Sequence, residues 1–315
     1  MKVQFSVLIT AYNRADLTRE AIDSVLAQTF TDYEVIVVDD GSTDHMPQVL
    51  ASYGTRIKAV RQPNQGVEAA LNHAASLAQG EYLCPLDNDD LFFPHTLATY
   101  DQVIRAFDSP PMILGSMTWF NHGEPIKEKA KKNCPVKVRK YADYLSKREP
   151  ISNTLSRIVI HRSLFDEFEG FGNKGGSPTD CYPDYDLMMR TGTHGPCILV
   201  HEPCTMARRV HATAFTQAYG LVYKGICGMA DSERKGLYPR GKHRRAQVHA
   251  VIGGFALQWV VKRFLWKTPK LAFLTIWKTA PMIVVAIWRK FLRFFHKQDQ
   301  LIVLPELESK LHPGN

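Results

Sequence analysis

The residues best suited to chemistry in this chain are two groups of carboxylates. Asp87, Asp89 and Asp90 fall within four residues, and Asp39 and Asp40 form an adjacent pair. Carboxylates this close repel one another unless a cation lies among them. Hard divalent ions prefer oxygen ligands, and Mg²⁺ is typically held by one or two carboxylates together with substrate phosphates. The clusters therefore indicate a Mn²⁺ or Mg²⁺ site that binds a diphosphate.

The same carboxylates also have a purely structural interpretation. Asp90 would then be a solvated helix cap at a strand end, and Asp40 a turn residue before Gly41. A lone acidic triplet would favour that interpretation. Both clusters, however, directly follow short apolar runs that are typical of buried strands. This shared position favours the metal site.

An alternation of strands and helices carries these clusters. Apolar runs typical of strands covered on both faces occur at 5–10, 34–38, 56–61 and 81–86. Helical patterns follow them at 15–28, 45–53, 66–78 and 94–107. Asp44 is placed to cap the second helix. Such an alternation predicts βαβ units, and so an α/β fold with a mostly parallel central sheet flanked by helices.

The carboxylates lie where such a sheet binds ligands. Ligands bind beyond the carboxyl ends of parallel strands, and polar residues follow three of the four predicted strands, at 10–14, 39–40 and 87–90. The turn after the first strand reads TAYNRAD, which has neither the GxGxxG of a dinucleotide site nor the GxxxxGK[ST] of a P-loop. The sequence therefore excludes these two nucleotide-binding classes.

The composition is that of a globular protein. Hydrophobic residues make up 45% of the 315 residues, which is enough for a sizeable core. The six cysteines form no CxxC pair and no zinc-ligand spacing, as is typical of reduced thiols in a cytosolic protein. The N-terminal sequence MKVQFSVLIT has no long apolar stretch, so we expect no signal peptide.

Positive charge is concentrated near the C-terminus. The net charge is +8, yet residues 234–297 hold 15 Lys and Arg and no Asp or Glu, so the rest of the chain is net acidic. Gly236, Pro239 and Gly241 also punctuate the chain at the start of this region. Together the shift in charge and the breaker residues predict a boundary within 232–241.

The basic C-terminal region has the pattern of helices that lie on a membrane surface. It contains four of the five tryptophans, Trp259, Trp266, Trp277 and Trp288, and spacings of 7, 11 and 11 residues return each to nearly the same helical face. Basic and bulky apolar residues occupy opposite faces of its last segment, as in interfacial helices. We therefore expect an anionic membrane surface as a partner. The expected location is cytoplasmic, peripheral on the inner face of the plasma membrane.

Other interpretations of this region differ in what covers the helices. Pro269 and Pro281 should break or kink the run into two or three helices. A helix that crosses the membrane is disfavoured, because Lys278 and Pro281 interrupt the apolar segment 271–288. This segment is also shorter than the roughly 20 apolar residues that a membrane-spanning helix needs. Ordinary packing on the catalytic body or on a second subunit stays an alternative. Nucleic acid is disfavoured as a partner because the aromatics are mainly tryptophan and the pattern is amphipathic.

Three segments in the first hundred residues form a specific combination: SVLITAYNRADLTREAIDSVLAQTFTDYEVIVVDDGSTD, PNQG and AQGEYLCPLDNDD. This combination resembles the donor half of the family 2 inverting glycosyltransferases of GT-A fold, of the type found in bacterial cell-surface polysaccharide synthesis. The match is dense over about 4–97. It continues more sparsely to about Thr216, through SRIVIHRSLFDEFEGF, PDYDLMMR and RRVH.

The resemblance implies roles for residues at matching positions. Nucleotide-sugar binding is implied for residues of the first loop and of later motifs: Thr10, Ala11, Tyr12, Arg14, Asp40, Asn72, Asp87 and Arg209. Asp89 of the DxD motif and His211 of an RxH element are implied to hold the Mn²⁺ or Mg²⁺ ion. One departure is Leu71, which stands where the family often has an arginine before the asparagine.

The implied catalytic base is Asp184 in PDYDLMMR, at the position of the acid in the family's ED motif. The acid that usually precedes the base is Pro183 here, so Asp186 and Asp180 stay alternatives for the base. Three aromatic residues are candidates for lining the acceptor site, with ordinary packing as the alternative: Trp119, Phe120 and Tyr182.

These roles describe metal-dependent transfer of a sugar from a nucleoside-diphosphate sugar, most commonly UDP-sugar in the family, to a glycan or lipid-linked saccharide. A base opposite the leaving group gives inversion by a single displacement. Two alternatives stay open, namely a polyprenyl-phosphate glycosyltransferase and a non-catalytic sugar-nucleotide-binding assembly protein. The predicted parts are a donor-binding subdomain at 1–110, an acceptor-binding and catalytic subdomain at 111–232, and a basic helical, membrane-associating region at 233–315.

Overall fold

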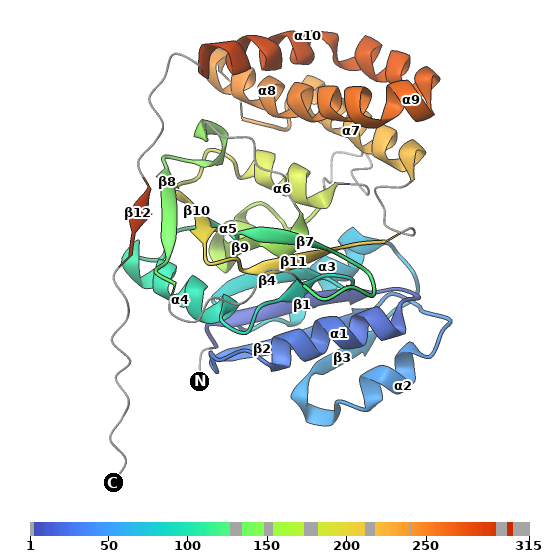
Figure 1. Cartoon of the computed structure of the whole chain (residues 1–315), viewed down its shortest axis with the longest axis vertical. Coiled ribbons are helices and arrows are strands. Elements are labelled where there is room, and N and C mark those ends of the chain that lie inside the picture. Colours follow the sequence, from blue (N-terminus) through green and yellow to red (C-terminus); the bar gives the residue numbers. More distant parts are fainter. Residues whose placement is uncertain are drawn as a thin grey trace.

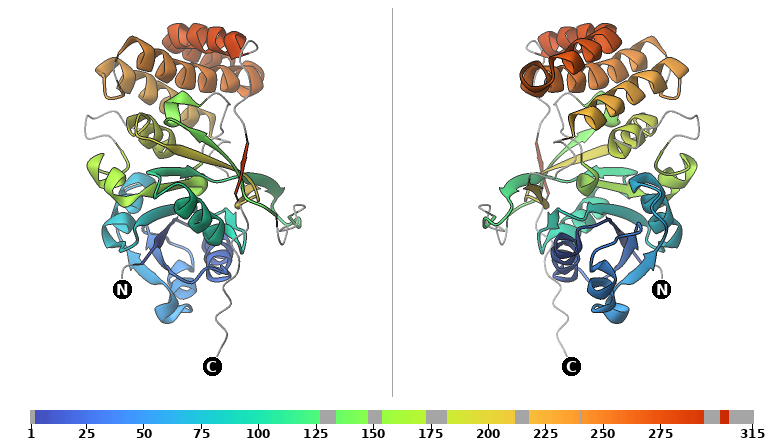
Figure 2. Two further views of the ribbon diagram at one scale, coloured as in Figure 1. Left: turned by 90° about the vertical axis from the view of Figure 1, so that its left-hand side faces the viewer. Right: turned by 90° about the vertical axis from the view of Figure 1, so that its right-hand side faces the viewer.

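The predicted alternation of strands and helices forms the base of a three-tiered molecule (Figure 1). A short helix lies above this base, and a layer of C-terminal helices forms the far end, as the side views also show (Figure 2). The structure is a computed structural model. It describes residues 3–126, 134–147, 154–172, 182–211, 218–239, 241–293 and 301–304.

The main sheet has nine strands in the order β12-β8-β10-β6-β9-β4-β1-β2-β3 among the described residues. The strands predicted from the sequence are β1 (Phe5–Ala11), β2 (Tyr33–Asp39), β3 (Lys58–Arg61) and β4 (Tyr82–Asp87). The later strands are β6 (Met112–Leu114), β8 (Lys137–Tyr141), β9 (Ile158–His161), β10 (Cys197–Glu202) and β12 (Ile302–Val303). The first four strands are parallel neighbours, whereas β9 pairs antiparallel with both β4 and β6.

The register of the parallel strands brings the predicted site residues to one edge. Thr10 lies opposite Val38 on one side and Asp87 on the other, and Ala11 lies opposite Asp39. β1, β2 and β4 therefore end together. The polar residues that follow each strand in the sequence thus become neighbours in space.

Each central strand is buried on both faces, as its continuous apolar run predicts. Val7 and Ile9 of β1 join one cluster, with side chains from the helices α1 (Ala15–Leu26), α2 (Met46–Ala51) and α4 (Thr96–Ala106). Leu8 points to the other face and packs with side chains of α3 (Val67–Leu77). Asp44 accepts from the N–H of Met46, the first residue of α2, at 3.1 Å, although the N-cap position itself is His45 and not Asp44. Short 3₁₀ turns lie at Gly54–Arg56, Tyr144–Ser146 and Leu155–Arg157.

A second, three-stranded sheet joins distant parts of the chain beside the acidic cluster. It consists of β5 (Leu91–Phe92), β11 (Met206–Val210) and β7 (Met117–Asn121), with β11 in the middle. Because β5 directly follows Asp90, its pairing with β11 brings residues 206–210 next to the acids. The same pairing brings the aromatic strand β7 alongside, parallel to β11.

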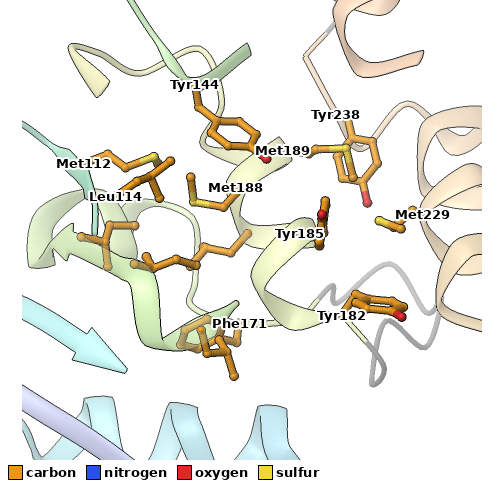
Figure 3. Packing of buried hydrophobic residues seen from close by; sticks show 14 of the residues in the cluster. Met112, Leu114, Tyr144, Phe171, Tyr182, Tyr185, Met188, Met189, Met229 and Tyr238 are labelled. Carbon is orange, nitrogen blue, oxygen red and sulfur yellow. The ribbon is translucent and has the colours of Figure 1, made fainter. Parts of the chain in front are cut away.

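Helix α6 (Pro183–Arg190) links the main sheet to the helical layer. Pro183 stands in its first turn, where a missing N–H costs nothing. Figure 3 shows Met112 and Leu114 of β6 on one side of this helix and Met229 and Tyr238 on the other. The sheet and the layer therefore share one apolar core across α6. The nearby α5 (Arg162–Glu167) follows β9.

The helical layer comprises α7 (Tyr219–Lys235), α8 (Lys242–Trp259), a π-helical stretch (Val260–Phe264), α9 (Leu265–Lys267) and α10 (Pro269–Arg293). Gly236 ends α7 with φ at 73°, a left-handed conformation that favours glycine. The break expected at Pro269 is present, since α10 begins there. Pro281, in contrast, lies inside α10, and the helix continues through it. The division into three parts stays a prediction.

Candidate functional site

The acidic cluster lies at the carboxyl end of β4. Asp87 is the last residue of that strand, and the acids after it lead directly into β5. Carboxylate oxygens of Asp87, Asp89 and Asp90 all lie within 4.8 Å of one another. The end of β1 at Thr10 is the adjacent strand end in the sheet. The fold thus assembles the predicted acids at the edge where α/β sheets bind ligands.

Hydroxyl and backbone N–H groups hold the carboxylates of Asp87 and Asp90. Thr154 Oγ1 donates to Asp87 Oδ2 at 3.0 Å, and Ser156 Oγ donates to Asp90 Oδ2 at 2.7 Å. The backbone N–H of Arg209 donates to the other oxygen of Asp90 at 3.1 Å. Asp90 is buried and precedes a strand, so its interpretation as a solvated helix cap is wrong. The physical reason is tertiary, because β11 and Ser156 cover it.

The packing of these acids disfavours their charged forms. Burial is the main cause that raises the pKa of Asp87 to about 6, and the charge of Asp89 adds to it. Burial and both neighbouring acids raise the pKa of Asp90 well above its ordinary value. A divalent cation among them would offset this penalty with positive charge. Three carboxylates in a space this small are a donor set that fits Mg²⁺ or Mn²⁺.

Asp89 differs from its neighbours because two basic side chains share one of its oxygens. Arg14 Nη1 lies 2.6 Å from Asp89 Oδ2, and His211 Nε2 lies 2.9 Å from the same atom. Arg14 immediately precedes α1, and His211 immediately follows β11. The structure therefore joins three residues that were assigned to donor and metal binding from far-apart motifs.

Asp184 lies in the first turn of α6 and is 6% exposed. Burial is the main cause that raises the pKa of its carboxyl to about 7, and the charge of Asp87 raises it further. The backbone N–H of Tyr185 and the charge of Arg208 act in the opposite direction. The pKa of Asp184 thus lies near neutral pH, and the charge of the acidic cluster contributes to it.

Asp186, one of the alternatives for the base, has a different environment. It is fully buried, Arg190 Nε lies 2.7 Å from its Oδ2, and the hydroxyl of Tyr238 donates to its Oδ1 at 2.9 Å. One oxygen is therefore paired within α6, and the other ties the helix to Tyr238. Asp180, the other alternative, lies outside the described residues. The geometry favours Asp184 over Asp186 as the group available to a substrate.

Two consecutive arginines of β11 have opposite surroundings. Arg209 is buried, where its guanidinium donates to Glu20 at 2.6 Å and to the carbonyl of Asp89 at 3.0 Å, and lies over the ring of Phe120. The charge of Arg208, in contrast, lowers the pKa of Asp87, Asp90 and Asp184. Sequence reasoning selected Arg209 and missed Arg208. The RRVH motif contains both, and only the strand's alternation decides which one faces the acids.

Two other predicted donor-binding residues are engaged within the protein. Asp40 accepts hydrogen bonds from Gln62 Nε2 at 2.8 Å and from the backbone N–H of Gln65 and of Gly66, both at 2.9 Å, at the start of α3. Asn72 exchanges two 2.8 Å hydrogen bonds with the backbone N–H and carbonyl of Phe171. The structure therefore uses both side chains to fasten α3.

Residues of the first loop and the aromatic candidates for the acceptor site differ in how exposed their side chains are. Tyr12 is 47% exposed after the buried Ala11, on the loop that leads to Arg14. Trp119 is 53% exposed, and the guanidinium of Arg208 lies 5.0 Å from its ring centre. Trp119 also lines a pocket together with Phe120, Asn121, Glu124 and Pro125. Tyr182, in contrast, is buried against Tyr185 and Phe255, so its packing interpretation holds.

Comparisons with known sequences agree on one family. The sequence model described as Glycosyl transferase family 2 matches residues 6–190, more than half of the chain. An uncharacterised glycosyltransferase of Rickettsia typhi is 38% identical over 109 residues, which cover 35% of this chain and 34% of that protein. The match thus spans about one third of the curated relative's length.

Comparisons with solved structures agree on the fold. S. aureus TarS 1–349 in complex with UDP-GlcNAc has a TM-score of 0.59 at 15% identity, over 90% of this chain and 82% of that chain. The Pyrobaculum calidifontis mannosyltransferase PcManGT, in complex with GDP-Man and Mn²⁺, has a TM-score of 0.52 at 17% identity, over 95% and 89%. At these identities the likeness concerns the fold alone.

Proposed function

The chain belongs to glycosyl transferase family 2, and from that premise we propose that it moves a sugar from a nucleoside-diphosphate sugar to a saccharide acceptor, with inversion at the anomeric carbon. It is a glycosyltransferase of GT-A fold. One observation carries the proposal: a cluster of three acids at the strand edge is electrically coupled to a buried carboxyl, Asp184, whose pKa is about 7.

The acidic cluster is the proposed diphosphate end of the donor site. Asp89 and His211 would hold the Mn²⁺ or Mg²⁺ ion, and Asp87 would lie beside the ribose. When bound, such an ion neutralises the charge that develops on the departing diphosphate. Arg14 and Arg208 already act on the acids electrostatically. In the presence of donor both guanidiniums can pair with phosphate oxygens, which arginine recognises through its fork of N–H groups.

Asp184 is the proposed general base. It takes the proton from the acceptor hydroxyl as the oxygen attacks the anomeric carbon. A base is most effective when its pKa lies near the operating pH, because it is then both ionised and strongly proton-seeking. The environment of Asp184 supports this role, since its pKa of about 7 far exceeds the ordinary value for aspartate.

The donor is proposed to be a UDP-sugar. Structural neighbours bind UDP-GlcNAc and GDP-Man, so their fold accepts more than one nucleotide. Uridine is the family's commonest case. Tyr12, exposed on the first loop, lies at the strand edge where the nucleotide is expected and offers its ring as a stacking surface.

The acceptor is proposed to be a glycan or lipid-linked saccharide. Trp119 supports this assignment because it is a half-exposed ring beside Arg208, whose charge reaches the acids. A flat aromatic surface of this kind suits the apolar face of a sugar ring better than it suits a bare phosphate. Trp119→Ala should therefore raise the KM for the acceptor in steady-state kinetics and leave donor affinity unchanged.

Calorimetry tests the donor site directly. UDP or UDP-sugar binding is measured in Mn²⁺, in chelator, and with Asp89→Ala in Mn²⁺. We expect clear binding in the first case and weaker binding in the other two. Asp32→Ala is a matched control, because this exposed acid precedes β2 at the opposite end of the strands. Equal affinity in all three conditions would overturn the metal site, and GDP in place of UDP tests the nucleotide.

A further inference from the structure

Helix α10 is amphipathic in a way that leaves a whole apolar side exposed. Its inner side packs on α8 through Ala272, Thr275, Thr279, Met282 and Ile283, all buried. The contact is close, since a Cβ added to Gly253 of α8 would collide with the carbonyl of Met282. The hydroxyls of Thr275 and Thr279 on this side each donate to the carbonyl four residues back at 2.7 Å.

The outer face of the layer is formed by exposed side chains that recur at helical spacing. Its members are Trp266 of α9 and Phe273, Ile276, Trp277, Val284, Ile287, Trp288 and Phe291 of α10. Trp266 is 82% exposed and Trp277 is 77% exposed. At 1.5 Å per residue, the α10 part of this face extends over about 27 Å. A large apolar patch of this kind on a folded protein marks an interaction surface.

Basic residues flank the outer face at both ends. Lys262, Arg263, Lys267 and Lys270 lie at its start, and Arg289 and Lys290 lie near its end. In the part of the chain that the structure describes, none of these six forms a salt bridge with a carboxylate. The partner must therefore offer an apolar interior and a negatively charged rim.

We propose that the outer face docks on a membrane surface that contains anionic lipids, with α10 lying parallel to that surface. The tryptophans and phenylalanines would enter the boundary between headgroups and acyl chains, and the flanking lysines and arginines would contact the phosphates. This is the balance of apolar burial and charge that holds interfacial helices.

The contacts of α10 favour lying on the membrane over crossing it. By length and composition, Pro269–Phe291 is apolar enough to span a bilayer. However, Lys278 Nζ lies 2.9 Å from Asp231 of α7, and Arg234 donates to the carbonyl of Lys278. Crossing would break these contacts and expose Thr275 and Thr279 to lipid. A second copy of this chain is a poorer partner, because it would bring two basic faces together.

Docking this face orients the rest of the molecule. Helix α8 is tied to the catalytic body, since Arg244 pairs with Asp143 at 2.8 Å and the ring of Phe255 packs on Tyr182 and Tyr185. Helix α6 lies between the sheet and this layer (Figure 1). The membrane would therefore lie on the side of the sheet from which α6 approaches the acids.

Vesicle flotation with the full chain tests the proposal independently of catalysis. We expect binding to phosphatidylcholine vesicles that contain phosphatidylglycerol, weak binding to phosphatidylcholine alone, release by high salt, and a blue shift of tryptophan emission. Lys267→Gln with Lys270→Gln should lower partitioning by on the order of 25-fold, about fivefold for each charge. Lys58→Gln, exposed on β3 at the opposite end of the molecule, is the charge control and should bind normally.

The apolar contribution is tested by Trp277→Ser with Trp288→Ser, two exposed positions at which the fold should persist. Circular dichroism and donor binding verify folding, and vesicle binding should fall. Three results would overturn the proposal. They are absence of binding to anionic vesicles, binding that resists alkaline carbonate as a span would, and a concentration-dependent dimer that both tryptophan changes abolish.

Discussion

The strand edge that carries the acids and the helical layer above it handle charge in opposite ways. At the strand edge, carboxylates lie close together and repel one another, and Thr154, Ser156 and the backbone of Arg209 hold two of them in place. In the layer, long basic side chains surround exposed tryptophans. We propose a small ligand, the sugar nucleotide, for the first region and a membrane surface for the second.

Helix α6 lies at the junction of these regions and contributes one aspartate to each. Asp184 is coupled to the acids at the strand edge, whereas Asp186 is bonded to Arg190 and to Tyr238, which lies in the link between α7 and α8. Both residues are aspartates, and they lie two positions apart in the same helix. Burial is common to both carboxyls, and the side-chain partners of Asp186 are the reason why we propose Asp184 as the base.

The sharpest test of this comparison is Asp184→Asn. The amide keeps the shape of the carboxyl and cannot accept a proton, so turnover should fall by about 10²–10⁴-fold. Donor affinity should stay close to that of the unchanged protein. Steady-state kinetics with calorimetric donor binding measures both. Full activity in this variant would remove Asp184 from the chemistry.

The converse change is Asp186→Asn, which should damage the fold rather than the reaction. It leaves the buried guanidinium of Arg190 without its charge partner, which costs about 3–5 kcal/mol of unfolding free energy. Urea unfolding followed by circular dichroism measures the loss. At a temperature where the variant is still folded, kcat should be nearly normal. A stable but inactive protein would instead make Asp186 the base.

The two arginines of β11, Arg208 and Arg209, differ in the same way as the two aspartates of α6. Arg208→Gln removes a positive charge that acts on Asp87 and Asp184, and a charge-assisted bond of about 1.5–3 kcal/mol to the diphosphate is worth roughly 10–100-fold in kcat/KM. Arg209→Gln is the matched control and should reduce stability more than kcat/KM, because its partners are Glu20 and a backbone carbonyl. If Arg209→Gln impairs kcat/KM more than Arg208→Gln does, the assignment is reversed.

The pH dependence follows from the raised pKa of Asp184. Activity requires the ionised form, so kcat/KM should fall about tenfold for each pH unit below about 7. The free energy of unfolding depends on pH in the opposite direction, because folding favours the protonated carboxyl of Asp184. In chelator, that contribution is present at low pH and is lost as the pH rises from the ordinary aspartate value towards 7. Asp184→Asn cannot ionise, so its thermal stability relative to the unchanged chain should increase as the pH rises from about 5 to about 8.

Sequence reasoning was successful where local pattern and parallel topology suffice. The four apolar runs predict β1 to β4, and parallel strands in register bring their ends together, so the acids after β4 and the loop after β1 had to be neighbours. The family and the GT-A fold are likewise confirmed. The assigned roles of the individual site residues stay predictions.

Other features depended on contacts that no local pattern carries. Asp90 is buried because Ser156 and β11 arrive from far along the chain, and Asn72 is occupied because Phe171 does. Of the four tryptophans expected on one helical face, Trp259 packs against Phe255 and Phe264 instead. The helix that carries it lies beneath α10, and helical periodicity cannot reveal which helix covers another.

The sequence by itself determined which chemical groups are available and at which strand ends they gather, because strand and helix periods are local properties of the chain. The tertiary structure decided which groups remain available to a ligand. Asp186 and Arg209 are bonded to protein partners, and we propose Asp184 and Arg208 as the residues that act on the substrate. The physical reason is that protein partners already satisfy the charge and hydrogen bonds of Asp186 and Arg209, and partners such as Tyr238 and Glu20 lie tens of residues away in the sequence.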